Sequence, residues 1–185
     1  MRIIAGKDKG RRLKSLKRRD VRPTTDRTKE SIFNILGPNI AGTRFLDLYS
    51  GFGGIGIEAL SRGAKEVVFV EKDRRNIKVI KDNLNLVDYE KISQIINNDV
   101  LRALPILNGE FDLIFMDPPY EETELYTNTL NKIKSYNLLS DKGIIIIEYD
   151  AKDKIEIPEG YSIIKEKRYG KAGIILVKEI KGKDE

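Results

Sequence analysis

The fold class is indicated most clearly by residues 45–56, Phe45-Leu46-Asp47-Leu48-Tyr49-Ser50-Gly51-Phe52-Gly53-Gly54-Ile55-Gly56. It begins with a short apolar run, which predicts a buried strand over 45–49, and its glycines predict a turn into a helix that ends at Arg62-Gly63. Glycines at such a turn let the backbone approach a ligand closely and leave its N–H groups able to donate hydrogen bonds. The same pattern also occurs in plain strand-to-helix turns, so the loop alone leaves both interpretations open.

Short apolar runs alternate with helical segments along the rest of the chain. After the opening strand, the sequence predicts strands over 67–70, 92–96, 111–116, 144–147, 161–164 and 173–177. The runs up to residue 147 are nearly continuous in apolar residues, which is typical of parallel strands covered on both faces. The last two strands are too close in sequence for a crossover helix, so they form a hairpin. We therefore expect an α/β fold with a seven-stranded, mostly parallel, doubly wound sheet, a C-terminal antiparallel hairpin strand and helices on both faces.

Helix boundaries are also readable from the sequence. The first helix begins at Thr25 or Asp26, either of which can cap it, and it ends before Gly37-Pro38. A later helix is expected over roughly 123–138, directly before the fifth strand.

The basic charge of the chain is concentrated at its start. Residues 1–22 contain ten basic and two acidic side chains, whereas the remainder contains 24 basic and 27 acidic ones. Such a patch attracts polyanions through phosphate neutralisation, although a charge run by itself is also typical of a solvated terminus. We interpret residues 1–22 as a basic N-terminal arm or hairpin, with Gly6 and Gly10 at turns, and residues 23–185 as one α/β domain.

Two missing residue types restrict the chemistry. The sequence has no cysteine and no histidine, so a zinc site is not expected. A Ser-His-Asp or Cys-His nucleophile and histidine acid–base catalysis are excluded. We expect no metal. No apolar run reaches the length of a membrane span and no secretory leader is recognisable, so we expect a soluble, cytoplasmic protein without a membrane partner. A monomer is the default expectation.

Polar residues follow two of the predicted strands. Glu71 ends the second strand, where a carboxylate can accept both hydroxyls of a ribose. Asp99 and Val100 follow the third strand, where the carboxylate can accept from an adenine amino group and the Val100 N–H can donate to a ring nitrogen. Glu71 is equally readable as a surface carboxylate, and Asp99 as a helix cap.

The strongest motif is Asp117-Pro118-Pro119-Tyr120, immediately after the fourth strand. Prolines fix the backbone and remove N–H donors, so the Asp117 carboxylate and the Pro118 carbonyl remain as acceptors. Two acceptors beside an aromatic ring suit a flat heterocycle with an NH2 group. Stacking on Tyr120 is worth ~1–3 kcal/mol, which offsets much of the cost of extruding a base. A rigid turn is the alternative, but all four motifs lie at the carboxyl ends of strands, where open α/β sheets bind ligands.

The motifs together resemble a known family. The pattern Asp-Leu-x-x-Gly-x-Gly-x-x-Gly followed by Asp-Pro-Pro-Tyr resembles the class I S-adenosylmethionine-dependent amino-methyltransferases, which have a Rossmann-like sheet. The further segments Arg22–Arg27 and Glu58–Ala64 resemble the RsmD family, which methylates the N2 amine of a guanine in small-subunit (16S) ribosomal RNA. The resemblance covers nearly the whole chain, and it implies that residues 23–185 are a methyltransferase domain.

The resemblance implies a role for each motif. Asp47, Gly51 and Gly53 hold the methionine part of S-adenosylmethionine. Glu71 binds the ribose, and Asp99 and Val100 read the adenine. The implied cofactor set also includes Tyr49, Ser50, Lys72 and Asp117. The target base is held by Asp117, Pro118, Pro119 and Tyr120. Phe52 departs from the family pattern, which has a small hydroxylated residue there.

The implied RNA contacts lie in the basic start and the first helix. They are Arg11, Arg12, Lys14, Arg18, Arg19, Arg22, Thr25 and Arg27. The arginines and lysine of the arm position RNA through its phosphates rather than read its sequence. Thr25 and Arg27 are also candidates for the carboxylate of the cofactor, and the sequence does not separate the two roles. The implied partner is ribosomal RNA, within the small subunit or its precursor.

Other functions fit part of the pattern. An adenine-N6 methyltransferase acting on DNA or RNA uses the same tetrapeptide, but for DNA it normally needs a target-recognition domain, for which 185 residues leave little room. A non-catalytic RNA-binding assembly factor on this scaffold would not need the acceptors at 117–120. A nicotinamide oxidoreductase has no use for Asp-Pro-Pro-Tyr. Methylation at pyrimidine C5 needs a thiolate, which this chain lacks.

Overall fold

The computed structural model describes residues 1–16, 24–119 and 122–180. The strands are β1 (Arg44–Leu48), β2 (Glu66–Glu71), β3 (Ser93–Asn97), β4 (Phe111–Met116), β5 (Leu139–Asp150), β6 (Tyr161–Tyr169) and β7 (Ala172–Glu179). The helices are α1 (Asp26–Leu36), α2 (Gly54–Ser61), α3 (Arg74–Leu86), α4 (Val100–Ala103) and α5 (Glu124–Ser135), with short 3-10 turns at Glu90–Ile92 and Leu104–Ile106.

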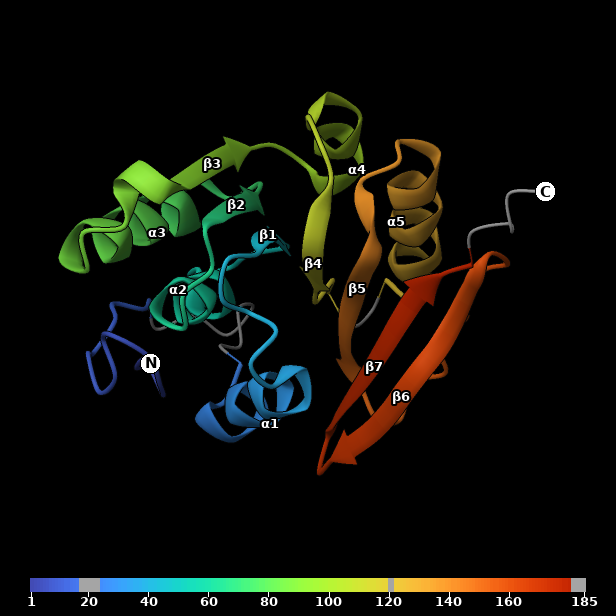
Figure 1. Cartoon of the computed structure of the whole chain (residues 1–185), viewed down its shortest axis with the longest axis horizontal. Coiled ribbons are helices and arrows are strands. Elements are labelled where there is room, and N and C mark those ends of the chain that lie inside the picture. Colours follow the sequence, from blue (N-terminus) through green and yellow to red (C-terminus); the bar gives the residue numbers. More distant parts are fainter. Residues whose placement is uncertain (17–23, 120–121, 181–185) are drawn as a thin grey trace.

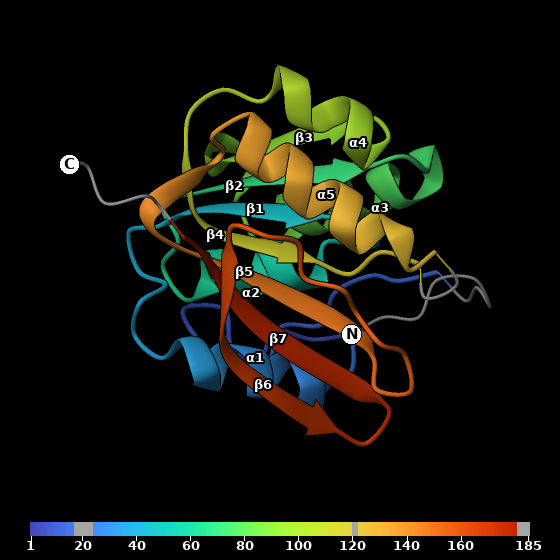
Figure 2. The same cartoon turned by 90° about the vertical axis from the view of Figure 1, so that its right-hand side faces the viewer.

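One mixed sheet carries the fold, with the strand order β3-β2-β1-β4-β5-β7-β6. Strands β1 to β5 run parallel, and β7 pairs antiparallel with both β5 and β6. Helices α1, α2 and α3 cover one face of the sheet, and α4 and α5 cover the other (Figures 1 and 2). The predicted seven-stranded α/β sheet with an antiparallel C-terminal hairpin is therefore confirmed.

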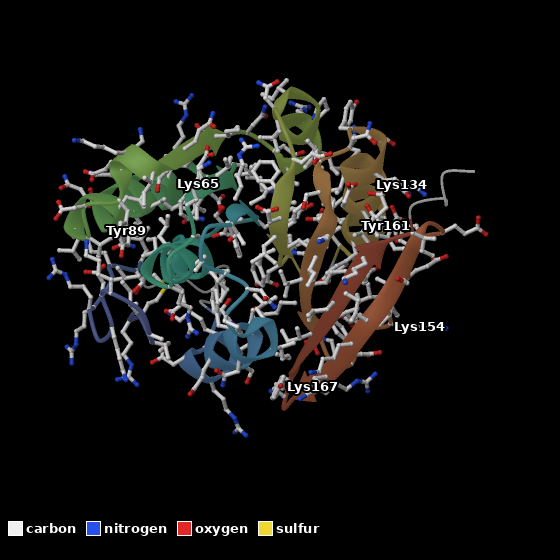
Figure 3. All side chains as sticks on the ribbon, viewed as in Figure 1. Lys65, Tyr89, Lys134, Lys154, Tyr161 and Lys167 are labelled. Carbon is white, nitrogen blue, oxygen red and sulfur yellow. The ribbon has the colours of Figure 1, made fainter. Side chains whose placement is uncertain are left out.

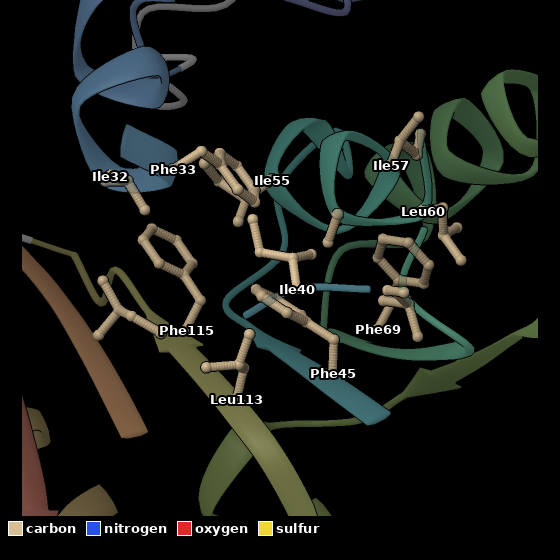
Figure 4. Packing of buried hydrophobic residues seen from close by; sticks show 14 of the residues in the cluster. Ile32, Phe33, Ile40, Phe45, Ile55, Ile57, Leu60, Phe69, Leu113 and Phe115 are labelled. Carbon is tan, nitrogen blue, oxygen red and sulfur yellow. The ribbon is translucent and has the colours of Figure 1, made fainter. Parts of the chain in front are cut away.

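Each face has its own hydrophobic cluster. Phe33 of α1, Ile55 of α2 and Phe45 of β1 are buried in the first cluster, which Figure 4 shows between the helices and the sheet. The second cluster packs Leu130 of α5 against the opposite face. These helices form because their apolar residues recur at helical spacing, and burial of each large side chain stabilises the fold by roughly 1.5–3 kcal/mol.

Three strands differ most from the prediction, two in their boundaries and one in its burial. Strand β5 begins at Leu139, not 144, because Leu139 pairs with Phe111 and the strand continues until Asp150 pairs with Ala172. Strand β6 extends to Tyr169, well beyond 164, since it pairs along its length with β7. Its outer residues are exposed and polar, so no apolar run marks them. Strand β3 is only partly buried, unlike the fully covered strand that its apolar residues indicate.

The first sixteen residues pack against α2 and α3. Arg2 and Arg12 form an isolated antiparallel bridge, and Ile3 and Leu13 are buried. Gly6 has φ +86°, and a Cβ atom there would lie 1.9 Å from the Ser61 carbonyl oxygen. Only glycine fits this contact, because any side chain would collide with the backbone of α2.

Glu58 of α2 joins this segment to two helices. Its side chain is fully buried and accepts hydrogen bonds from the backbone N–H groups of Ile4 (2.8 Å) and Ala5 (3.0 Å). Arg62 Nε lies 2.8 Å from one carboxylate oxygen, and Nζ of the buried Lys29 of α1 lies 3.5 Å from the other. Lys29 also donates to the Arg2 carbonyl. Burying a carboxylate is costly unless it is paired and hydrogen-bonded. Glu58 therefore fixes where α1 and the N-terminal segment lie.

Among the helices that the structure describes, none is long and apolar enough to cross a membrane.

Glu58→Ala is expected to lower the free energy of unfolding by about 3–5 kcal/mol, because it leaves the Lys29 ammonium buried without its carboxylate. Chemical denaturation measures the change. Asp82→Ala is the matched control: it removes the exposed Lys14–Asp82 pair, at 3.0 Å, and is expected to cost no more than about 1 kcal/mol. Equal losses in the two variants would contradict the role of Glu58.

Candidate active site

The loop after β1 has a backbone that most residues avoid. Tyr49 (φ +57°), Gly51 (φ +54°) and Gly53 (φ +77°) all lie in the left-handed region. Tyr49 is costly there because it carries a bulky side chain. Its hydroxyl is 2.8 Å from Thr129 Oγ1 of α5, and burial raises the pKa of Tyr49 to about 12. This bond links the loop to the helix on the opposite face of the sheet.

Asp47 anchors the far end of the same loop. Its side chain is buried, and Oδ2 accepts from the Gly56 N–H at 2.9 Å. A Cβ atom on Gly56 would lie 2.3 Å from the Phe69 ring. Helix α2 therefore approaches the sheet more closely than a residue with a side chain at position 56 would allow. Burial raises the pKa of Asp47 well above its ordinary value, and the neighbouring Glu71 adds to the effect.

Glu71 closes the loop from β2. Its carboxylate accepts from the Gly51 N–H and the Asp73 N–H, both at 2.8 Å, and only 7% of the residue is exposed. Ser50 donates through its hydroxyl to the Asp47 carbonyl, and Lys72 is exposed beside Glu71. Phe52, which departs from the family pattern, is buried, and its carbonyl accepts from Asn83 of α3.

Asp99 follows β3 and caps α4. Its carboxylate accepts from the Leu101 N–H at 3.0 Å, which is the helix-cap role that the sequence left open. Val100 is the first residue of α4 and its side chain is buried.

Asp117 extends β4 toward the same edge of the sheet. Leu48 of β1 pairs with Met116, and Met116 pairs with Ile147 of β5, so Asp117 comes level with Glu148. Burial raises the pKa of Asp117 well above its ordinary value, and the nearby carboxylates of Glu148 and Asp47 raise it further. Pro118 is buried and Pro119 is exposed. Tyr120 lies outside the described residues.

Glu148 is a component of this edge that the sequence reasoning missed. Only 3% of the residue is exposed, one carboxylate oxygen accepts from Thr24 Oγ1 at 3.2 Å, and its carbonyl accepts from the Tyr126 hydroxyl. An acidic residue directly after Ile144–Ile147 was the available signal. It was not used because no glycine or proline motif marks the end of β5.

A cavity of about 140 Å³ lies beside Glu148, between the start of α1, the end of β5 and the β6–β7 turn. Its lining residues are Thr24, Thr25, Arg27, Thr28, Glu148, Asp150, Tyr169, Gly170, Lys171 and Ala172. Figure 3 shows Lys167 near the hairpin end that borders it. The structure therefore brings Thr25 and Arg27 together with the end of β5, and Thr25 also caps α1 by accepting from Thr28.

The described part of the basic arm lies elsewhere. Arg11 donates to the Leu86 carbonyl at the end of α3, Lys14 pairs with Asp82 of the same helix, and Arg12 is exposed. Figure 1 shows this segment on the α3 side of the molecule, away from the β6–β7 hairpin. Arg18, Arg19 and Arg22 lie outside the described residues. Within the described ranges, no group of three or more acidic side chains is arranged to hold a metal ion.

Comparison with known proteins places these features in a family. A family model described as Conserved hypothetical protein 95 matches residues 1–178. The protein YlbH of Bacillus subtilis is 41% identical over 97% of this chain and 99% of its own length. Ribosomal RNA small subunit methyltransferase D of Haemophilus influenzae is 36% identical over 92% of this chain and 89% of its own. The solved structure of yhhF from Escherichia coli has a TM-score of 0.87 at 29% identity, covering 98% and 99% of the two chains.

Asp117→Asn is expected to stabilise the protein more at neutral pH than at acidic pH. Because the folded state raises the pKa of Asp117, protonation favours folding below the ordinary carboxyl pKa of about 4, and this advantage is lost as the pH rises through the folded-state pKa. Asparagine does not ionise, so the stability of the variant lacks this dependence on pH. Urea denaturation from about pH 4 to pH 8 should show the advantage of the variant growing with pH; an advantage that stays constant would contradict the buried-carboxylate interpretation.

Proposed function

Because the chain belongs to the RsmD family, matched by the model described as Conserved hypothetical protein 95, we propose that it is an rRNA methyltransferase. It transfers a methyl group from S-adenosylmethionine to the exocyclic N2 amine of a guanine in small-subunit (16S) ribosomal RNA. The observation that carries the proposal is the position of Asp117: it faces the same side of the sheet as Asp47, one strand away, beside the glycine loop.

The residues at the strand ends fit the cofactor. Gly51 and Gly53 present a loop backbone without side chains, and Asp47 and Glu71 supply the carboxylates that an ammonium group and ribose hydroxyls require. Asp99 and Val100, which follow β3, would read the adenine. Bound S-adenosylmethionine supplies an electrophilic methyl group on a sulfonium centre.

Asp117 and Pro118 prepare the nucleophile. An amine on a purine is a poor nucleophile because its lone pair is delocalised into the ring. When the Asp117 carboxylate and the Pro118 carbonyl accept hydrogen bonds from its two N–H groups, the lone pair of the amine is directed away from the ring plane. The main contribution of these residues is then positioning, together with electrostatic stabilisation of an amine that becomes positively charged. No base is needed, because a methylated aryl ammonium loses its proton readily.

The cavity beside Glu148 supports an RNA role for Thr25 and Arg27. Both residues line it from the start of α1, together with Glu148 and Asp150 of β5, and no residue of the glycine loop is among its lining residues. The small ribosomal subunit or its precursor is the partner that we propose, with the protein acting in the cytoplasm as a monomer and without a metal.

The substrate is identified by transfer of a tritiated methyl group. Small ribosomal subunits that lack the modification, free ribosomal RNA and DNA are offered in parallel, and the labelled nucleoside is then identified. We expect N2-methylguanine in the small-subunit RNA. Labelled N6-methyladenine would instead support the adenine-directed methyltransferase. The absence of label in every substrate would favour a non-catalytic assembly factor.

Asp117→Ala is expected to lower the rate of methyl transfer by about 100-fold or more, because it removes an acceptor that acts on the reacting amine. Binding of S-adenosylhomocysteine, followed by calorimetry, should be retained. Asp112→Ala, at the exposed start of the same strand, is the control and should keep its activity. Loss of cofactor binding with base binding intact would reassign Asp117 to the cofactor.

A further inference from the structure

The cavity beside Glu148 has a polarity that suits a nucleotide. Its inner wall carries the buried carboxyl group of Glu148, whereas the cations Arg27 and Lys171 are exposed at its rim. Its volume, about 140 Å³, is similar to that of a cavity of ~150 Å³ that holds a benzene ring. Acceptors lie at depth and positive charges lie near solvent, which matches a base edge that enters first and a phosphate that stays outside.

Glu148 lies next to the acceptors that hold the reacting amine. It is level with Asp117 on the neighbouring strand and on the same face of the sheet, because Met116 and Ile147 pair directly before them. The two carboxylates interact electrostatically. Thr24 donates a hydrogen bond of 3.2 Å to the Glu148 side chain, and a carboxylate can accept about four hydrogen bonds.

We propose that Glu148 selects guanine by accepting the N1–H of the target base, while Asp117 and Pro118 hold the adjacent N2 amine. The inference rests on the proposed function and names the residue that reads the base. On the edge of guanine that pairs in a duplex, the N2 amine and the N1–H point the same way from neighbouring ring positions. Two carboxylates on adjacent strands, facing the same side, match two donors in this arrangement.

The same geometry rejects adenine. Adenine also presents an amine, but the neighbouring N1 carries a lone pair instead of a hydrogen. Placed against the Glu148 carboxyl group, that lone pair would meet an acceptor, and both groups would lose water without gaining a bond. A site built to bind one donor discriminates strongly against an analogue that lacks it. Glu148 thus discriminates between guanine and adenine as the target base, whereas the Asp-Pro-Pro-Tyr motif alone does not.

The test replaces the target guanine with 2-aminopurine, which keeps the amine to be methylated but has no hydrogen on N1. Small subunits are reconstituted with either base at the position mapped by the tritium assay, and kcat/KM is measured for both. For the wild type we expect guanine to be preferred by about 100-fold or more. Equal rates would overturn the proposal whatever the variants do.

Glu148→Gln is expected to reduce this preference to about 10-fold or less, because the amide can accept from guanine or donate to N1 of 2-aminopurine. The missing O6 of 2-aminopurine affects both enzymes equally, so the change in the ratio isolates Glu148. Glu66→Gln makes the same substitution at the opposite edge of the sheet, in a partly exposed pair with Arg44, and should keep the wild-type ratio. Thermal unfolding of both variants checks that they fold.

The outcomes separate the two proposals. If the wild type methylates no guanine in small subunits, the proposed function fails. If it methylates guanine, but Glu148→Gln slows both substrates by the same factor, Glu148 is only structural and this inference alone fails.

Discussion

One buried carboxylate determines where the accessory parts of this fold lie. Glu58 accepts from the N-terminal segment, pairs with Arg62 of its own helix and faces the buried Lys29 of α1. Because a buried charge is tolerated only when its partners surround it, these elements form together. The start of α1 then lies beside the end of β5, and the cavity next to Glu148 exists because of that placement. The site thus depends on an ion pair outside it.

Much of the sheet was predictable because local patterns mark its strands. The apolar runs of β1, β2 and β4 and the glycine loop at 51–56 are read directly from the sequence, and strand–helix alternation implies parallel pairing. The far half of β6 was not predictable, because its shape comes from pairing with β7 and its own side chains are polar and exposed. The N-terminal contacts were also missed: a glutamate in a helix shows no local sign that it will be buried against residues more than 50 positions away.

The candidate site was predicted in outline, since acidic residues at strand ends meet at one edge of a parallel sheet. Its details were not. Glu71 holds the backbone of the glycine loop, Asp47 holds the start of α2, and Asp99 caps α4. These three side chains, which are expected to bind the cofactor, therefore order the chain around them. Burial raises the pKa of Asp47 and of Asp117, so keeping these two groups ionised costs stability, which is common at functional sites.

The exposed outer strand has a consequence for the behaviour of the protein at high concentration. Strand β6 ends the sheet and exposes Ile163 and Ile164, so its free backbone edge could recruit a strand from another molecule. Lys165, Lys167 and Arg168 follow on the same strand and are also exposed. With Glu166 between them, this stretch has a net positive charge, so a second copy aligned along this edge would be repelled, and the repulsion opposes sheet extension into aggregates. The same charged residues that make β6 hard to predict from the sequence also oppose its pairing with another copy of the protein.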